Sequence, residues 1–182
     1  MNDVPVLETE RLRLRLPTEA DFEGLLTLMS DPVATAYIGG VMSPPHVWRS
    51  LCTILGHWRL RGYGFFSVEE KATGAWVGRV GPWFPYGWVS PEVGWSITRD
   101  HWGKGYGPEA AAASLDYVFD QLGWDRVIHL IHADNANSQA VARKLGSVDT
   151  GEDAEAAGFG LMCDVWGQSR KDWRANRKRI SA

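Results

Sequence analysis

A glycine-rich segment in the second half of the chain has the composition of an anion-binding loop. The sequence from Trp102 to Pro108 is WGKGYGP, so three glycines alternate with Lys104 and Tyr106. Glycine adopts left-handed backbone conformations and lets a ligand approach the chain closely. Pro108 suits the first turn of a helix, and the positive end of that helix would face the loop. We therefore expect this segment to hold a diphosphate at a helix start.

The spacing of the glycines separates this loop from two common phosphate-binding motifs. The P-loop places Ser or Thr after its lysine to hold magnesium, but Gly105 follows Lys104 here. The dinucleotide fingerprint requires a glycine three residues after the second one, and that position is Pro108. The strands expected before the loop also form a hairpin rather than a βαβ unit. Neither an NTPase nor a dinucleotide site is therefore expected.

Two histidines and an aspartate downstream of the loop invite comparison with a metal site. His129 and His132 are an odd number of residues apart on an expected strand, so their side chains should face opposite sides and cannot share an ion with Asp134. We therefore expect no metal. His132 is a secondary candidate for a base because histidine titrates near neutral pH. Cys163 has no base assigned beside it and is expected to be a small core residue.

Hydrophobic periodicity predicts the elements that would position these residues. Alternating, β-branched or aromatic runs indicate strands, and apolar residues at helical spacing indicate helices. The predicted strands cover residues 11–16, 65–70, 75–83, 88–98, 127–133 and 161–168. The predicted helices cover residues 18 to about 30, about 45 to 62, 108–121 and 138–145. This order predicts an α+β fold with a mixed sheet.

Composition and charge bound the class of protein. The chain has 182 residues, 45% of them hydrophobic and 23% charged, as expected of one soluble domain over residues 1–182. A net charge of -3 gives no general attraction for nucleic acid or for anionic membranes. The stretch from about residue 170 is basic, and we expect a solvated tail there, with an RNA or ribosome contact as the alternative.

The cysteines and the N-terminus indicate the compartment. Cys52 and Cys163 are the two cysteines of the chain, so a disulfide framework is not expected and both should be buried, reduced thiols. Residues 1–15 place charges where a signal peptide needs an apolar core, and no segment approaches a membrane span. The sequence therefore predicts a cytoplasmic protein with no membrane partner.

Motifs in order along the chain resemble the GNAT superfamily of N-acetyltransferases. The segment Trp102–Gly107 is similar to the family's acyl-CoA loop, and Pro91–Ile97 is similar to its fourth strand. Asn135–Ser138 and Lys144–Gly146 resemble its Asn-x-x-Ser and Lys-x-Gly-Phe segments. Together with residues 8–15 and 164–173, these segments extend the resemblance over nearly the whole chain.

Residues 8–15 and 164–173 are like the branch of the family that contains the RimJ/RimL ribosomal-protein N-terminal acetyltransferases. The resemblance implies the GNAT fold, a mixed and mostly antiparallel central sheet flanked by about four helices. It also implies acetyl-CoA as cosubstrate and direct transfer of the acetyl group to an amine, either a protein N-terminus or a small molecule. A non-catalytic acyl-CoA-binding regulatory module is the alternative, and a homodimer is left open.

The resemblance further implies roles for individual residues. Backbone groups around Ile97 and Thr98 would pair with the pantetheine and polarise the thioester carbonyl. Asn135 would hydrogen-bond the pantetheine amides or cap the next helix, and Ser138 would donate to the thiolate or act as such a cap. The expected cofactor-binding residues are Ile97, Thr98, Trp102, Gly103, Lys104, Gly105, Tyr106, Gly107, Asn135 and Ser138.

Glu92 is the expected general base, because the family often places an acid at this point. Strand alternation puts its side chain on the same face as Gly94 and Ser96. From there a carboxylate can take a proton from an amine, directly or through water. The alternative is an ordinary exposed strand glutamate. Glu92 and Ser138 are thus the two candidate catalytic residues.

Three positions depart from the family pattern. Trp102 replaces the Gln or Arg that opens the loop, and Ser147 stands where phenylalanine is usual. Ala142 stands where many members have a tyrosine that protonates the thiolate, which leaves the general acid open.

The acceptor site is the part that the sequence defines least. Loops at about residues 39–46 and 149–159 are expected to shape it, and neither carries a decipherable motif. The acidic residues Glu152, Asp153 and Glu155 hint at a cationic acceptor.

Overall fold

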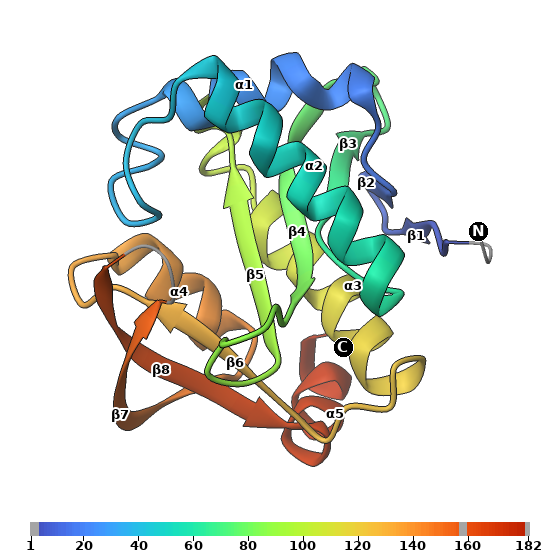
Figure 1. Ribbon diagram of the computed structural model, residues 1–182. Coiled ribbons are helices and arrows are strands. Elements are labelled where there is room, and N and C mark those ends of the chain that lie inside the picture. Colours follow the sequence, from blue (N-terminus) through green and yellow to red (C-terminus); the bar gives the residue numbers. More distant parts are fainter. Residues whose placement is uncertain (1–3, 157–159, 181–182) are drawn as a thin grey trace.

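The computed structural model describes residues 4–156 and 160–180, which form one mixed sheet with helices on both faces (Figure 1). The eight strands lie in the order β1-β2-β3-β4-β5-β6-β8-β7. All neighbouring strands in this part of the chain are antiparallel except β5 and β6, which are parallel. The strands are β1 Leu7–Glu8, β2 Leu12–Arg15, β3 Phe66–Glu70, β4 Trp76–Trp83, β5 Glu92–Ile97, β6 Arg126–Ile131, β7 Val148–Ala156 and β8 Leu161–Ser169. The helices are α1 Phe22–Ser30, α2 Pro44–Arg61, α3 Tyr106–Asp120, α4 Ala136–Lys144 and α5 Arg170–Ile180.

The hydrophobic core lies on both faces of the central strands. In β2, Leu12 and Leu14 are fully buried and Arg13 is exposed, which confirms the alternation seen in the sequence. Figure 1 shows α3 behind the sheet and α2 in front of it, and the apolar side of α3, including Leu115 and Val118, joins the main core cluster. The α+β fold predicted from the sequence is confirmed.

The ends of several elements differ from the prediction by a few residues. The strand expected from residue 88 begins at Glu92, and the helix expected from Pro108 begins at Tyr106. The earlier start of α3 follows from Gly105, which takes a left-handed conformation with a φ of 80° and serves as the N-cap. The glycine loop is therefore shorter than the sequence suggested, and two of its residues belong to the helix.

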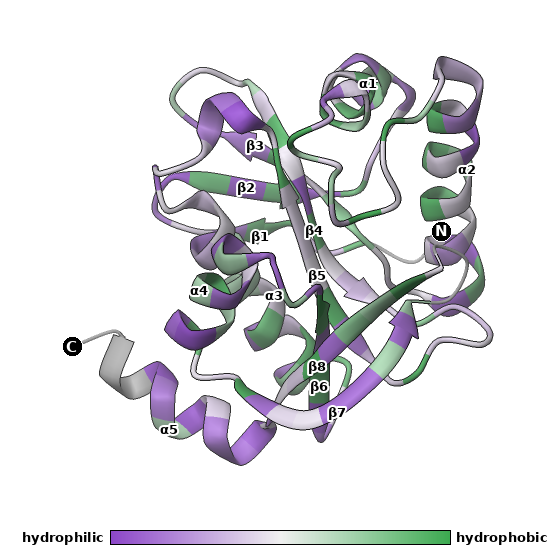
Figure 2. Cartoon of the chain, turned by 90° about the vertical axis from the view of Figure 1, so that its left-hand side faces the viewer, coloured by the Kyte–Doolittle hydropathy of each residue, from purple (hydrophilic) through white to green (hydrophobic). Residues whose placement is uncertain are grey.

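Strand β7 was not predicted. Residues 149–159 were expected to form a substrate loop, but Val148–Ala156 pairs antiparallel with β8 at the edge of the sheet. Its side chains are mostly exposed and polar, and Figure 2 shows much of this strand in the hydrophilic colour. Residues 157–159 of the expected loop lie outside the described residues. The missing apolar alternation explains the error, because edge-strand pairing depends on backbone groups.

The basic C-terminal stretch is a docked helix and not a solvated tail. Trp173 of α5 is buried, and its Nε1 donates to Asp116 Oδ1 of α3 at 2.9 Å. Asn176 Nδ2 donates to Leu145 O at 2.8 Å, close to Gly146, which has a φ of 82°. Most of the other α5 residues that Figure 2 colours are hydrophilic. One buried aromatic side chain among charged residues gave too weak a periodic signal to predict the helix.

The cysteines also correct the sequence analysis in part. Cys163 is buried as expected, but Cys52 is exposed on α2. Within the described ranges, no helix has both the length and the apolar character needed to cross a bilayer.

The sheet splits between its two parallel strands. A single register position joins β5 to β6, Glu92 opposite Ile128, with Ile128 N donating to Pro91 O at 2.9 Å. The next bond of a parallel ladder would run from Leu130 N to Val93 O. Instead, Leu130 N donates to Glu92 Oε1 at 3.0 Å, and His129 Nδ1 donates to Val93 O at 2.6 Å. Two side chains thus replace the missing backbone bond, and beyond them the strands diverge (Figure 1).

Docking of α5 can be tested by truncating its buried tryptophan. We expect Trp173→Ala to lower the free energy of unfolding by about 3–5 kcal/mol, because a large buried aromatic side chain is lost. Arg174→Ala is the control, since Arg174 pairs with Asp120 at the surface and should change stability by less than about 1 kcal/mol. Urea denaturation of both variants measures the difference, and equal stabilities would mean that the helix does not dock.

Candidate functional site

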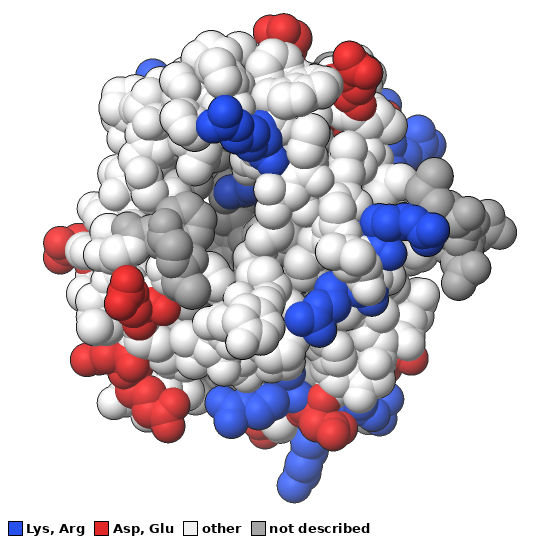
Figure 3. Space-filling model, in the orientation of Figure 1, with Lys and Arg blue, Asp and Glu red and all other residues white. Residues whose placement is uncertain are grey.

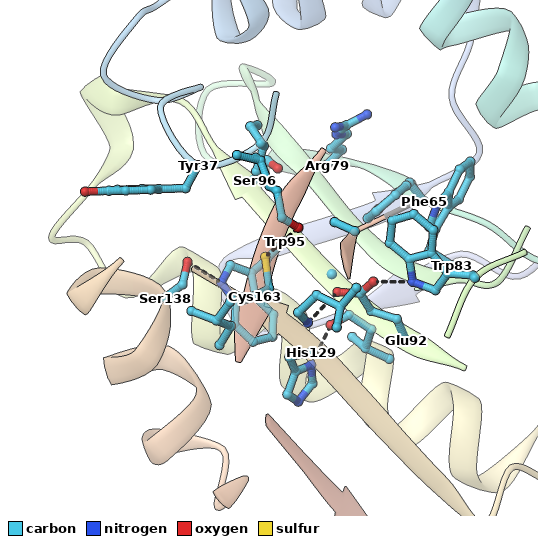
Figure 4. Close-up of a pocket in the computed structure, with 18 of the residues that line it drawn as sticks. Tyr37, Phe65, Arg79, Trp83, Glu92, Trp95, Ser96, His129, Ser138 and Cys163 are labelled. Carbon is cyan, nitrogen blue, oxygen red and sulfur yellow. Dashed lines mark hydrogen bonds between the residues drawn. The ribbon is translucent and has the colours of Figure 1, made fainter. Parts of the chain in front are cut away.

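Two hollows open beside the split and share part of their lining. The inner cavity, of about 410 Å³, is lined by aromatic side chains such as Phe65 and Trp83 together with Arg79 and Glu92 (Figure 4). The loop groove, of about 640 Å³, follows the glycine loop and the start of α4. Residues that line both are Tyr37, Ile38, Trp95, Ser96, Asn135 and Ser138. A molecule in the groove can therefore meet a second molecule in the cavity.

The glycine loop presents backbone N–H groups at a helix start. Gly103 and Gly105 have φ angles of 75° and 80°. The first backbone bond at the start of α3 runs from Glu109 N to Gly105 O at 3.3 Å. The N–H groups just before it have no acceptor inside the helix and lie at the positive end of the helix dipole. This arrangement favours an anion such as a diphosphate in the groove.

The side chains of the glycine loop form contacts within the protein, so that its backbone faces the groove. Trp102 Nε1 donates to Ile97 O at 2.7 Å. Tyr106 is buried and its hydroxyl donates to Glu70. The Lys104 side chain is exposed, and Lys104 is not among the described residues that line the groove. The candidate contacts of this segment are therefore peptide groups rather than side chains.

An ion pair that the sequence analysis did not single out fixes the loop. Arg11 donates from Nη1 to Lys104 O at 2.8 Å and from Nε to Glu109 Oε2 at 2.7 Å. Thr9 Oγ1 donates to Glu109 Oε1 at 2.6 Å. These contacts tie the first strands to the first turn of α3. Arg11 and Glu109 are 98 positions apart, so local sequence pattern gave no sign of their pairing.

The hydrogen bonds of β5 decide which of its peptide groups face the groove. Thr98 N donates to Val77 O of β4 at 3.0 Å. Peptide groups alternate in direction along a strand, so those of Trp95 and Ile97 face the split instead. The N–H of Ile97 thus has the orientation expected for pairing with pantetheine, whereas its carbonyl oxygen already accepts from Trp102 Nε1. The N–H of Thr98 is already bonded within the sheet and does not suit that role, whereas Trp95 is an additional candidate.

Asn135 and Ser138 stand together where the two hollows meet. Asn135 Oδ1 accepts from Ser138 N at 3.1 Å, so Asn135 caps α4 as the alternative interpretation stated. This bond uses the oxygen and leaves the amide N–H₂ able to donate to a ligand. Ser138 does not act as the cap. Its Oγ accepts from Trp95 Nε1 at 3.3 Å, which leaves the hydroxyl proton available for donation (Figure 4).

Glu92 is a buried carboxyl and not an exposed strand residue. Its side chain accepts from Trp88 Nε1 at 2.7 Å and from Leu130 N at 3.0 Å. Burial raises the pKa of Glu92 to about 7, although both hydrogen bonds act in the opposite direction. A carboxyl with this pKa can both accept and release a proton near neutral pH.

The histidines near the split have different surroundings. His129 is buried between Val93 O and Ser147 Oγ, which lies 2.9 Å from its Nε2, and burial lowers the pKa of His129 to about 4. Ser147 also accepts from Gln168 Nε2 at 2.8 Å, so the serine that replaces the family's usual phenylalanine joins a polar network. His132 lines the inner cavity and stacks on Tyr37 with 5.1 Å between ring centroids.

Cys163 lines the inner cavity but is buried, and burial raises the pKa of its thiol. That shift disfavours the thiolate that covalent catalysis needs. In the part of the chain that the structure describes, no three His, Cys, Asp or Glu side chains are grouped to hold a metal ion.

Arg79 is a cavity residue that sequence reasoning missed. It lies on β4 directly opposite Ser96 of β5. The available signal was a lone charge between apolar residues, VGRVG, inside the strand predicted over residues 75–83. Long arginines often reach solvent from such positions, so the pattern alone did not identify it as part of a site.

Comparison with known proteins places the chain in a family. The family model described as "Acetyltransferase (GNAT) domain" matches residues 11–148. The uncharacterized protein YkkB of Bacillus subtilis is 33% identical over 154 residues, which cover 80% of this chain and 87% of that protein. The uncharacterized N-acetyltransferase YoaA of the same species is 26% identical over 145 residues, covering 78% and 82%.

Solved structures agree with this assignment. An acetyltransferase from Agrobacterium tumefaciens str. C58 superposes with a TM-score of 0.82 at 28% identity, covering 93% of this chain and 97% of that chain. A putative ribosomal-protein-serine acetyltransferase from Vibrio cholerae has a TM-score of 0.76 at 24% identity, covering 93% and 99%, and shows the shared fold alone. The chain belongs to the GNAT acetyltransferase family and is an acyltransferase with the GNAT fold.

The opposed pKa shifts of Glu92 and His129 predict how stability depends on pH. In the unfolded chain His129 binds a proton below about pH 6.5, whereas in the folded protein it stays neutral until about pH 4. The unfolded state thus binds more protons between these pH values, and His129 makes stability fall on acidification. Folded Glu92 keeps its proton up to about pH 7, whereas the unfolded residue loses it near 4.5, so this group makes stability fall as the pH rises. The two effects cancel between about pH 4.5 and 6.5.

Glu92→Gln removes one of these effects. We expect the free energy of unfolding of the variant to fall by about 1.4 kcal/mol more per pH unit than that of the wild type on going from pH 6.5 to 4.5. Denaturant titrations at three pH values measure this slope. Glu23→Gln, which changes an exposed glutamate of α1, should give a profile parallel to the wild type. A parallel profile for Glu92→Gln as well would contradict the shift.

Proposed function

We propose that the protein transfers the acetyl group of acetyl-CoA directly to an amine held in the inner cavity. The observation that carries this proposal is the shared lining of the two hollows, where Trp95 and Ser138 would bring a thioester and an amine together. The glycine loop would hold the diphosphate, and the peptide groups of Trp95 and Ile97 would hold the pantetheine arm. We place the reaction in the cytoplasm, in keeping with the unpaired cysteines.

In the proposed reaction the lone pair of the neutral amine attacks the thioester carbonyl carbon. The C–S bond breaks, CoA leaves as a thiolate, and the proton lost by the amine nitrogen passes to Glu92. A pKa of about 7 suits Glu92 to this task at neutral pH. A strand rises about 3.3 Å per residue, so Glu92 lies roughly 13 Å along β5 from Ser96. The proton would therefore travel through water in the cavity.

Ser138 is the proposed donor to the thiolate. Its hydroxyl accepts from the Trp95 indole and can direct its own proton to the sulfur. Ala142 is fully buried in the position where many relatives of this family carry a tyrosine, and it has no proton to give. A thiol pKa of about 8.5 makes the demand on this donor modest.

Two classes of amine fit the proposed reaction. Residues 8–15 and 164–173 resemble the RimJ/RimL branch, which favours a protein N-terminus as acceptor. The inner cavity, which several aromatic side chains help to line, also suits a small amine. Turnover with peptides and with small amines therefore has to be compared directly.

Binding of acetyl-CoA through the loop can be tested at Gly105. We expect Gly105→Ala to weaken binding about tenfold, because a left-handed backbone costs other residues about 1–2 kcal/mol and the N–H groups would lose their convergence. Gly62→Ala is a matched control, since Gly62 has a φ of 78° at the end of α2, has open space around its α-carbon and does not line the groove. Calorimetry should show wild-type affinity for this control. Failure of the wild type itself to bind acetyl-CoA would refute the proposed function.

The role of Glu92 can be tested by the pH dependence of turnover. We expect kcat/KM of the wild type, calculated for the neutral form of the amine, to rise with pH and to level off above an apparent pKa of about 7. Glu92→Gln should lower kcat/KM by about 10²–10⁴-fold and remove this rise while acetyl-CoA affinity is kept. CoA release measures both, with Glu23→Gln as the control. Binding of acetyl-CoA without turnover of any peptide or amine would instead support the non-catalytic acyl-CoA-binding module.

A further inference from the structure

Arg79 is a cation of the inner cavity that has no counter-ion. Its Nε atom is inaccessible to solvent and has no hydrogen-bond partner. In the described ranges no carboxylate lies within ion-pair distance of it, and the contact that the structure shows is the face of the Phe65 ring, 5.0 Å from the guanidinium carbon. Burial lowers the pKa of Arg79 to about 10, with no neighbouring charge to oppose the shift.

The other arginines whose side chains the structure describes are paired or exposed. Arg15, which is also partly buried, binds Asp21 at 2.7 Å and Glu69 at 3.2 Å. Arg61 stacks on Phe84 but is exposed to solvent. Arg79 is only partly exposed and its Nε is shut off from solvent, and guanidinium groups in such surroundings are normally paired with an anion. An unpaired cation that faces a cavity is therefore a candidate for binding an anionic ligand.

The composition of the cavity agrees with an anionic ligand. Among the described lining residues, Arg79 is the one Lys or Arg, and Glu92 is the one acid. The acidic residues Glu152, Asp153 and Glu155, which had hinted at a cationic acceptor, lie on β7 and do not line it. Figure 3 shows basic atoms at the upper edge of the hollow on this face, with acidic side chains gathered below it.

The position of Arg79 restricts where the anion would lie. Arg79 is opposite Ser96, which belongs to the shared lining, whereas Trp83 is opposite Glu92 farther along the strands. Figure 4 likewise shows Arg79 nearer to Ser96 than to Glu92. Residues opposite each other on paired strands have Cβ atoms about 4.5–5.5 Å apart. An anion on Arg79 is thus close to the place where the amine would meet the thioester.

The walls of the cavity add a requirement on the rest of the acceptor. Phe65 and Trp83 stack with 5.1 Å between their ring centroids, and Trp88 also lines the cavity. Such a wall favours an apolar or flat group. The acceptor thus needs three parts: an anion for Arg79, an amine at the shared lining and an apolar body against the aromatic rings.

We propose that the acceptor is a small amino acid-like molecule whose carboxylate binds the Arg79 guanidinium and whose amine is one or two carbons away. This inference rests on the proposed acetyl transfer and specifies its substrate. Arginine binds a carboxylate through two parallel N–H···O bonds, which would also orient the amine toward the thioester. A peptide N-terminus lacks a carboxylate at this distance and is the competing acceptor.

Matched pairs of amines test the inference by CoA release. The pairs are phenylalanine with phenethylamine and tryptophan with tryptamine, and peptides that begin with the same residues form a third set. We expect the carboxylated member of each pair to have at least a hundredfold higher kcat/KM than its partner amine or peptide. Equal rates within a pair, or faster acetylation of the peptides, would overturn the inference while leaving the acetyl transfer in place.

Variants locate the effect at Arg79. Arg79→Met should reduce the preference for the carboxylated amine at least tenfold, keep acetyl-CoA affinity, and leave the melting temperature unchanged or higher because an unpaired charge is removed. Arg61→Met, which changes the exposed arginine on Phe84, should keep the preference. A large fall in melting temperature of Arg79→Met with an unchanged preference would show a structural role and refute the assignment.

A binding measurement separates this inference from the proposed function. In the presence of CoA, N-acetylphenylalanine should bind to the wild type and bind at least tenfold more weakly to Arg79→Met, whether or not any amine is acetylated. Calorimetry gives both affinities, and the phosphonate analogue of the same compound tests the choice of carboxylate. Equal binding to both proteins, or tighter binding of the phosphonate to the wild type, would reject a carboxylate on Arg79.

Discussion

The structure depends on a backbone hydrogen bond that the sheet does not make. Past Ile128 the parallel pair β5–β6 lacks the bond from Leu130 N to Val93 O that a regular ladder would form. Each of the two groups is bonded to a side chain instead, Leu130 N to Glu92 and Val93 O to His129. Buried peptide groups without partners are costly. The two side chains thus let the strands separate and leave the space in which the groove and the cavity meet.

This arrangement gives Glu92 two tasks that constrain each other. Its carboxylate accepts from Leu130 N and Trp88 Nε1 and so satisfies the N–H groups at the split. Its burial also raises its pKa toward neutrality. A glutamate in solvent would be a weaker base and would leave Leu130 N unbonded. His129 is the counterpart, since burial keeps it neutral and lets Nδ1 donate while Nε2 accepts. The polar network that stabilises the split therefore also sets the protonation state of the candidate base.

The sequence predicted the parts of this site that depend on local chemistry. The glycine loop was readable because positive φ angles and a helix start require particular residue types, and Asn135 was readable as a cap. Features that depend on distant contacts were not. The pairing of Arg11 with Glu109, the burial of Glu92 and the isolation of Arg79 follow from which strands become neighbours. The polar edge strand β7 and the docked helix α5 were missed because exposed side chains dominate both segments.

Arg79 and Glu92 are kept in the lining of the inner cavity at a cost to stability, which suggests why they stand where they do. The free energy of unfolding of such a domain is only about 5–15 kcal/mol. A buried carboxyl and an unpaired guanidinium therefore lower it by a significant fraction. Trp83 is opposite Glu92, four residue pairs along the strands from the Arg79–Ser96 pair, and Phe65 contacts both the Trp83 ring and the Arg79 guanidinium. If Arg79 and Glu92 were adjacent they would form an ion pair, which would lower the pKa of Glu92 and occupy the guanidinium. Their separation by an aromatic wall keeps the carboxyl basic and the cation available, and a ligand that binds Arg79 recovers part of the cost.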